Sequence, residues 1–235
     1  MENLEPNENL ETAAGLRARQ LAALSHHLIK LAETEKAALA RRLHDDLGGC
    51  LTVISLDLLV VAEHLRQTEP DLALRLQRAI AAIKDAVTLK RHIIDALRPS
   101  MLDSLGLSAC LTDHALEFQK RTGIQITTDI CNDFDSIHAD SAIDIFRIAE
   151  ESFLNVERHA DARRIWISLQ PRDGGARLLI EDDGVGIASE VMNMPESRGM
   201  IGMRERMALN GGSLKIFQRH HGSGTAVEAL FPLSR

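Results

Sequence analysis

The sequence predicts an α+β protein in two parts, a helical hairpin followed by a domain in which helices cover one face of a sheet. From about Leu16 to Leu65 there is no proline, and leucines recur at helical spacing. A second helical run follows the break at Pro70. Beyond Leu102, short β-branched segments alternate with helical ones. A length of 235 residues suits two modest domains, each with its own core.

Two apolar stripes predict the hairpin. The first helix places these residues at helical spacing: Leu39, Leu43, Leu47, Leu51, Ile54, Leu58 and Leu65. The second alternates steps of four and three through Leu76, Ile80, Ile83, Val87, Lys90, Ile94 and Leu97, where Lys90 is the one polar interruption. Pro99 ends this helix at Arg98. Because a lone hairpin leaves one apolar flank uncovered, the sequence predicts a homodimer that forms a four-helix bundle.

The second part is expected to be a layer of helices on an antiparallel or mixed sheet. Helices are predicted near 107–121 and 141–159, and strands near 124–130, 164–170, 177–181, 212–217 and 225–231. Aromatic residues make up only 3% of the chain, so aliphatic side chains must form most of the core. Trp166 lies on a β-branched run and is expected to be part of that core.

Composition excludes several classes of function. The net charge of −7, with basic and acidic residues interspersed, disfavours direct binding of nucleic acid. Cys50, Cys110 and Cys131 have no metal-binding or disulfide spacing, which fits a reducing cytoplasm. Residues 1–15 are polar and acidic, and we expect a disordered leader. The apolar stretch at 54–62 is far shorter than the roughly 20 residues of a membrane helix, so no membrane span is expected.

Four polar or glycine-rich clusters follow one another along the second part. They are Glu151-x-x-x-Asn155, Asp182-Asp183-Gly184-Val185-Gly186, Gly199-Met200-Ile201-Gly202 and Gly222-Ser223-Gly224-Thr225. Residues four apart share a helix face, so the first cluster offers two oxygen ligands suited to Mg²⁺. Asp182 is suited to accept a hydrogen bond from an exocyclic amine such as that of adenine. Gly199 and Gly202 precede a helix whose first N–H groups suit a polyphosphate.

Each cluster alone is more often a turn, a hairpin loop or a solvated helix face, but the four in this order indicate a nucleotide site. The chain resembles sensor histidine kinases with a GHKL-type (Bergerat) ATP-binding domain, and it is similar to the subfamily that signals to LuxR/NarL-type response regulators. Arg41-Arg42-Leu43-His44-Asp45 matches the phosphoacceptor pattern of that family, and the run from Leu97 to Leu107 matches its linker. The glycine-rich clusters match its nucleotide boxes.

The resemblance covers about Glu35 to the C-terminus. After the disordered leader expected at 1–15, it implies a dimerisation and phosphotransfer hairpin at 16–101 and an α/β-sandwich ATP-binding domain at 102–235. ATP and Mg²⁺ are the expected cofactors, with Mg²⁺ held by Glu151 and Asn155. The expected nucleotide-binding residues are Glu151, Asn155, Arg158, His159, Asp182, Gly184, Gly186, Gly199, Gly202, Gly224 and Thr225. Arg158 and His159 are expected either to contact phosphates or to form a surface helix end. Residues 187–198 lie where the family has its ATP lid.

His44 is the expected phosphoacceptor and Asp45 its general base. On a helical wheel His44 lies about 100° from the stripe through Leu43 and Leu47, so it is expected to face solvent. An imidazole with a pKa of ~6.5 is nucleophilic near neutrality, provided that its second nitrogen gives up its proton as the N–P bond forms. Asp45 is placed to take that proton. The other histidines apart from His159 are interpreted as surface or capping residues, His114 among them.

Two departures from the family pattern and two alternatives remain. Gly49 stands where kinases that also dephosphorylate their regulator carry a glutamine, so weak or absent phosphatase activity is expected. No sensory domain is recognisable before Leu16, so a separate sensor protein or a small ligand is expected to supply the signal. The alternatives are an ATPase of the chaperone or DNA-repair kind, with Glu151 activating water, and a non-catalytic dimerisation and regulator-binding module.

Overall fold

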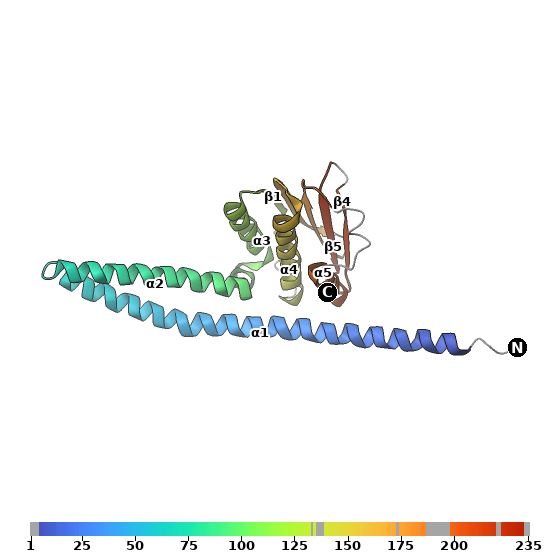
Figure 1. The fold of residues 1–235 in the computed structure, drawn as a ribbon, viewed down its shortest axis with the longest axis horizontal. Coiled ribbons are helices and arrows are strands. Elements are labelled where there is room, and N and C mark those ends of the chain that lie inside the picture. Colours follow the sequence, from blue (N-terminus) through green and yellow to red (C-terminus); the bar gives the residue numbers. More distant parts are fainter. Residues whose placement is uncertain are drawn as a thin grey trace. The chain divides into compact units, whose positions relative to one another are not determined.

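The computed structural model describes residues 5–132, 134, 139–172, 174–186, 198–219 and 222–232 (Figure 1). The chain divides into two compact units. One comprises Lys30–Ser100, and the other comprises Met1–Ile29 together with Met101–Arg235. Each unit is built from the kind of element that its sequence pattern favours, helices in the first and a helix-covered sheet in the second.

Two long helices form the hairpin. Helix α1 spans Glu5–Leu65 and α2 spans Pro70–Leu97, with Arg66–Glu69 as the turn between them. α1 therefore begins upstream of Leu16, within the segment for which the sequence predicted a disordered leader. Pro6 does not prevent this, because proline is tolerated in the first turn of a helix.

The predicted seam of α2 is the less exposed face of that helix. Ile80 and Ile94 are buried, and Leu76, Ile83 and Lys90 are half-buried. Val87 of the same seam is exposed. Elsewhere the hairpin exposes many other large apolar side chains, namely Leu39, Leu47, Val53, Ile54, Leu56, Leu59, Val60, Val61, Leu72, Leu74, Leu89 and Ile93. So large an uncovered apolar surface is typical of an interaction face.

Helix α1 is long and apolar enough to cross a membrane, judged by length and composition alone. The stretch Gly15–Leu65 contains a window of 18 residues with mean hydropathy of at least 1.2, of which 6% is buried. A helix of a soluble protein passes the same test, so one such helix is weak evidence. The expectation that the chain has no membrane span is therefore not confirmed.

The second unit is the predicted layer of helices on a mixed sheet. Its strands are β1 (Gln125–Ile130), β2 (Arg164–Arg172), β3 (Gly175–Asp182), β4 (Ser213–Gln218) and β5 (Thr225–Pro232). They lie in the order β1-β2-β3-β5-β4, with β1 parallel to β2 and all other pairs antiparallel. The helices are α3 (Ser100–Thr122), α4 (Ala139–Asn155), the short π-helix η1 (Val156–Ala160) and α5 (Arg198–Leu209).

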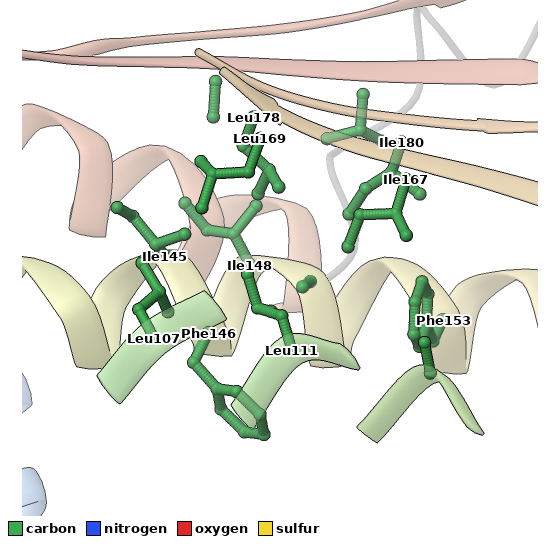
Figure 2. Packing of buried hydrophobic residues seen from close by; sticks show 14 of the residues in the cluster. Leu107, Leu111, Ile145, Phe146, Ile148, Phe153, Ile167, Leu169, Leu178 and Ile180 are labelled. Carbon is green, nitrogen blue, oxygen red and sulfur yellow. The ribbon is translucent and has the colours of Figure 1, made fainter. Parts of the chain in front are cut away.

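Aliphatic side chains join the helices to the sheet, as the low aromatic content predicted. Alternate residues of β2 and β3 are buried, so a single face of the sheet packs on the helices. Figure 2 shows Ile145 and Ile148 of α4 between Leu107 and Leu111 of α3 on one side and strand residues on the other. α3 can follow this surface because it bends at Gly106, whose φ of 81° is unfavourable for other residues.

Two residues lie elsewhere than the sequence predicted. Trp166 is outside the core, on the opposite face of the sheet, where the guanidinium of Arg219 lies 3.9 Å from the centre of its ring. The alternation that marks a strand does not reveal which face is covered. His114 of α3 is not a surface residue either, because its ring stacks on Phe153 at 5.5 Å and meets the edge of Phe146 at 5.0 Å.

The position of His114 predicts a pH-dependent stability. Burial lowers the pKa of His114 from its ordinary 6.5, although Glu150 acts in the opposite direction. The unfolded chain therefore takes up a proton below about pH 6.5 that the folded domain disfavours, and the free energy of unfolding falls as the pH drops further. His114→Phe should flatten this dependence. Urea unfolding followed by the fluorescence of Trp166, the single tryptophan, measures it, and equal pH slopes for both proteins would refute it.

Candidate functional site

A cavity of about 420 Å³ lies between the helices and the sheet of the second unit. α4 and η1 form one wall, the ends of β3 and β5 form another, and α5 contributes two methionines. It is lined by Ser152, Asn155, Val156, His159, Ala160, Ile180, Asp182, Gly186, Met200, Met203, Ile216, Thr225 and Val227. A volume of several hundred Å³ with mostly apolar walls and a few polar groups is typical of a small-molecule site.

Asp182 is a buried carboxylate in the wall of this cavity. It closes β3, and its side chain is 4% exposed. Its Oδ1 accepts a hydrogen bond of 2.8 Å from the N–H of Gly184, and both the N–H and the hydroxyl of Thr225 also donate to the carboxylate. Burial raises the pKa of Asp182, and these hydrogen bonds oppose the rise. They hold the carboxylate in one orientation at the cavity wall.

The neighbouring Asp183 binds the backbone at the start of β2. Its Oδ1 accepts hydrogen bonds of 2.8 Å from the N–H groups of both Arg163 and Arg164 at the start of β2. Burial acts to raise the pKa of Asp183, but these bonds outweigh it and the pKa is lowered. Asp183 therefore fixes the start of β2 beside the end of β3, and Asp182 lines the cavity. The sequence predicted that Asp182 recognises the nucleotide, and that role stays a prediction.

Two glycines allow backbone to approach closely beside Asp182. A Cβ on Gly184 would lie 2.1 Å from the carbonyl oxygen of Ala160, the same oxygen that accepts a hydrogen bond from Val185 at 2.8 Å. A Cβ on Gly224, whose φ is +121°, would lie 1.9 Å from the carbonyl oxygen of Asp182. Only glycine fits either position, so both predicted residues build the site through their backbone.

The helical wall ends in an irregular turn. α4 continues into one turn of π-helix that ends at Asp161, the only described non-glycine residue with a positive φ (48°). π-turns often occur at functional sites because the extra residue changes where side chains point. Here Asn155 and His159 both reach the cavity, whereas Arg158 is exposed and does not line it. For Arg158, the alternative of a surface helix end fits the geometry better.

The remaining predicted residues lie around the cavity. The carboxylate of Glu151 lies against Gly199 at the start of α5, where a Cβ would fall 1.8 Å from its Oε1. Gly202 is inside α5 and has open space beside it. Gly186, with a φ of +78°, lines the cavity and approaches Gly224. The lid predicted at 187–198 lies outside the described residues except for its last one.

An ion pair holds the other end of α5 against α4. Asp144 accepts hydrogen bonds of 2.8 Å from the guanidinium of Arg206 and from the side-chain amide of Asn210. Ser141 donates to the amide oxygen of Asn210 at 3.2 Å. Asp144 is nearly buried, which makes such a charge-assisted network stronger than one in water.

Sequence reasoning missed the apolar lining of the cavity. Met200 and Met203 of α5, with Ile180 and Ile216 from the sheet, form much of its surface. The methionines at 200, 203 and 207, spaced at helical intervals, were the only signal, because the pairing of α5 with the sheet is a tertiary property.

The residues present fit a hydrated magnesium ion. No cluster of three or more metal-binding side chains occurs among the described residues. Asn155 lines the cavity, and Glu151, one helical turn earlier on α4, has its carboxylate against Gly199 at the start of α5, so the two residues offer oxygen ligands. Mg²⁺ usually takes only one or two protein oxygens and completes its octahedron with water and phosphate.

His44 and Asp45 belong to the other unit. Both side chains are exposed on α1, as the helical wheel predicted for His44. The imidazole is therefore accessible to an incoming reactant, and the carboxylate follows it directly in the sequence. Thr52 donates to the carbonyl of Gly48 at 2.8 Å, so the helix continues past the two glycines at 48 and 49.

The contact between Gly184 and Ala160 predicts opposite effects for two glycine substitutions. Gly184→Ala should destabilise the second unit by about 1–3 kcal/mol, because its methyl group meets backbone that cannot move aside. Gly202→Ala should leave stability unchanged or raise it by up to about 1 kcal/mol, because alanine favours the helix and meets open space. Urea unfolding monitored by Trp166 fluorescence compares them. Equal midpoints would show that the close approach is not required.

Both parts of the chain are similar in sequence to known protein families. Residues 35–102 match the family described as histidine kinase, and residues 140–235 match the family described as histidine kinase-, DNA gyrase B-, and HSP90-like ATPase. The sensor histidine kinase MctS of Rhizobium johnstonii is 34% identical over 92% of this chain and 47% of its own length. LiaS of Bacillus subtilis, also a sensor histidine kinase, is 30% identical over 85% of this chain and 54% of its own length.

A third relative and a solved structure agree with these matches. UhpB of Salmonella typhimurium, a signal transduction histidine-protein kinase/phosphatase, is 28% identical over 89% of this chain and 41% of its own length. The histidine kinase domain of a blue-light activated kinase from Erythrobacter litoralis has the same fold, with a TM-score of 0.51 and 21% identity over 79% of this chain and 94% of that domain. The chain spans about half the length of the curated relatives it matches. It belongs to the sensor histidine kinases, with a histidine kinase domain followed by an ATPase-type domain.

Proposed function

We propose that the chain is an ATP-dependent protein-histidine kinase of a two-component system. It phosphorylates His44 and passes the phosphoryl group to an aspartate of a response regulator. The observation that carries this proposal is the buried, hydrogen-bonded Asp182 in the wall of a 420 Å³ cavity. Family membership and the exposed imidazole of His44 support it.

In this proposal ATP occupies the cavity of the second unit. Asp182 accepts a hydrogen bond from the adenine amine, and the apolar walls contact the base. Glu151 and Asn155 would hold Mg²⁺, which would neutralise charge on the phosphates. The match of 140–235 to a family that includes ATPases supports the use of ATP.

The chemistry at His44 follows from charge. An imidazole nitrogen of His44 forms the N–P bond as the bond between the γ-phosphorus and the bridging oxygen of ATP breaks, and ADP leaves. The other ring nitrogen loses its proton to Asp45, which keeps the product imidazole neutral. Exposure of both side chains on α1 supports this assignment, because a donor must reach them from outside the helix.

The proposed partners are a second copy of the chain and a LuxR/NarL-type response regulator. The uncovered apolar residues of α1 and α2 support a homodimeric four-helix bundle, because removing them from water favours association. The match of 35–102 to the histidine kinase family supports a response regulator as acceptor. A separate sensor protein or small ligand delivers the input. We place these two units in the cytoplasm, with no direct contact to nucleic acid.

Incubation of the full chain with γ-labelled ATP and Mg²⁺ tests this function. Label that is acid-labile and base-stable should appear on the protein, as expected for phosphohistidine. His44→Gln removes the acceptor and Asn155→Asp places a fixed charge at the metal site, so both should reduce labelling to background. ATP hydrolysis without labelling would favour an ATPase of the chaperone or DNA-repair kind. Absence of nucleotide binding would favour a non-catalytic module.

We propose further that the chain lacks the usual phosphatase activity. Gly49 has no side chain to orient an attacking water, and nothing lies within 4 Å of the position that its Cβ would take. The nucleotide-free protein with Mg²⁺ should therefore leave a phosphorylated regulator at its spontaneous rate of decay. Gly49→Gln supplies an amide there and should accelerate the loss of phosphate. Rapid dephosphorylation by the unaltered chain would overturn this proposal.

A further inference from the structure

Lys90 is the polar residue in the apolar seam of α2, and it is half-buried. A lysine at such a position packs its aliphatic stem and extends its ammonium to the edge of the interface. Here the ammonium lies against α1, because a Cβ built on Gly48 would be 3.0 Å from Nζ. The lysine therefore occupies space that any side chain at position 48 would need. Gly49, the next residue, has nothing within 4 Å of its Cβ position.

Gly48 lies on the flank of α1 that carries the phosphoacceptor. In an α-helix, residues four apart are separated by about 40° and about 6 Å along the axis. Gly48 is four residues after His44 and three after Asp45, so its position on the wheel falls between the two. The ammonium of Lys90 thus lies about one helical turn from both exposed side chains. This separation is comparable with the Debye length of about 8 Å at physiological ionic strength.

We propose that Lys90 is a positioning residue for phosphoryl transfer at His44. Its ammonium, packed against Gly48, provides a fixed positive charge beside the imidazole. The proposal rests on the proposed kinase function. The group that arrives at His44 carries about two negative charges, and Asp45 follows His44 directly in the sequence and adds another carboxylate. A cation held by the opposite helix lowers the cost of gathering this charge. Because its stem is half-buried in the seam, Lys90 loses less freedom on engagement than a fully exposed lysine would.

Replacing Lys90 separates its charge from its packing. Lys90→Met keeps an unbranched apolar stem without the charge, and Lys90→Arg keeps the charge. Lys90→Met should lower the kcat of autophosphorylation about tenfold and leave the KM for ATP within about twofold, because the nucleotide site is in the other unit. Lys90→Arg should restore most of the rate. Lys84→Met is the matched control, since Lys84 is an exposed lysine of the same helix, and it should behave as the unaltered chain.

A purely structural role gives the opposite pattern. A methionine should suit an apolar seam better than a lysine, so Lys90→Met would then unfold at a higher temperature and label at the unaltered rate. Sedimentation of each variant establishes that the dimer is intact. An unchanged kcat for Lys90→Met overturns the proposal, and so does a tenfold loss that Lys90→Arg fails to restore.

Two glycine variants test independently whether the packing of the Lys90 ammonium against Gly48 matters for the rate of autophosphorylation. Gly48→Leu and Gly49→Leu both replace a helical glycine with a strong helix former, but only the first occupies the space of Nζ. Gly48→Leu should slow autophosphorylation by about the same factor as Lys90→Met, and Gly49→Leu should leave it within about twofold. Equal rates for the two variants contradict the proposal. If the unaltered chain takes no label on His44, the kinase function itself fails, which is a different result.

Discussion

The site in the second unit depends on the close approach of two backbones, the carbonyl of Ala160 and the peptide that runs through Gly184 and Val185. The carbonyl accepts a hydrogen bond from Val185 at 2.8 Å, and only a glycine at 184 leaves room for it. This contact ties the end of η1 to the end of β3. It thereby sets the distance between the helical wall that carries Asn155 and the strand end that carries Asp182, and the cavity exists between them.

Asp182 and Asp183, the two consecutive acids at the end of β3, have different structural roles. Asp183 accepts hydrogen bonds from the peptide N–H groups of Arg163 and Arg164, so it stabilises the start of β2. Asp182 is bound by Gly184 and Thr225, which leaves it at the cavity wall. Backbone N–H groups thus hold both carboxylates, and the hydroxyl of Thr225 adds a further donor at Asp182. A site assembled in this way is rigid before any ligand arrives, which reduces the entropy lost on binding.

The helices and strands could be predicted from the sequence because apolar residues recur with a fixed period in each kind of element. Alternation at β2 and β3 and the seam of α2 predicted their elements within a few residues. Backbone crowding at Gly184 and Gly224 admits only glycine, which is why the glycine clusters were informative about local structure. The nucleotide-binding roles of these residues and of Asp182 stay predictions. Placement between elements was less predictable. His114, Trp166 and Met203 all lie where one element meets another, and no local pattern specifies which neighbour covers them.

The start of α1 illustrates a related limit. A polar composition predicted disorder before Leu16, yet the helix begins at Glu5. Glutamate, leucine and alanine all favour helix, and a helix that is already formed downstream adds residues without a second nucleation step. Composition therefore reports poorly on a segment that is attached to a long helix.

The network of Asp144, Arg206 and Asn210 has a mechanical consequence for α5. It anchors the carboxyl-terminal end of that helix to α4, whereas the contact at the opposite end is between the Glu151 carboxylate and Gly199. Any adjustment of α5 to an occupant of the cavity therefore costs least as a pivot about Arg206. Met200 would then move farther than Met203. The part of the cavity near Gly199 would therefore change shape more than the part lined by Met203.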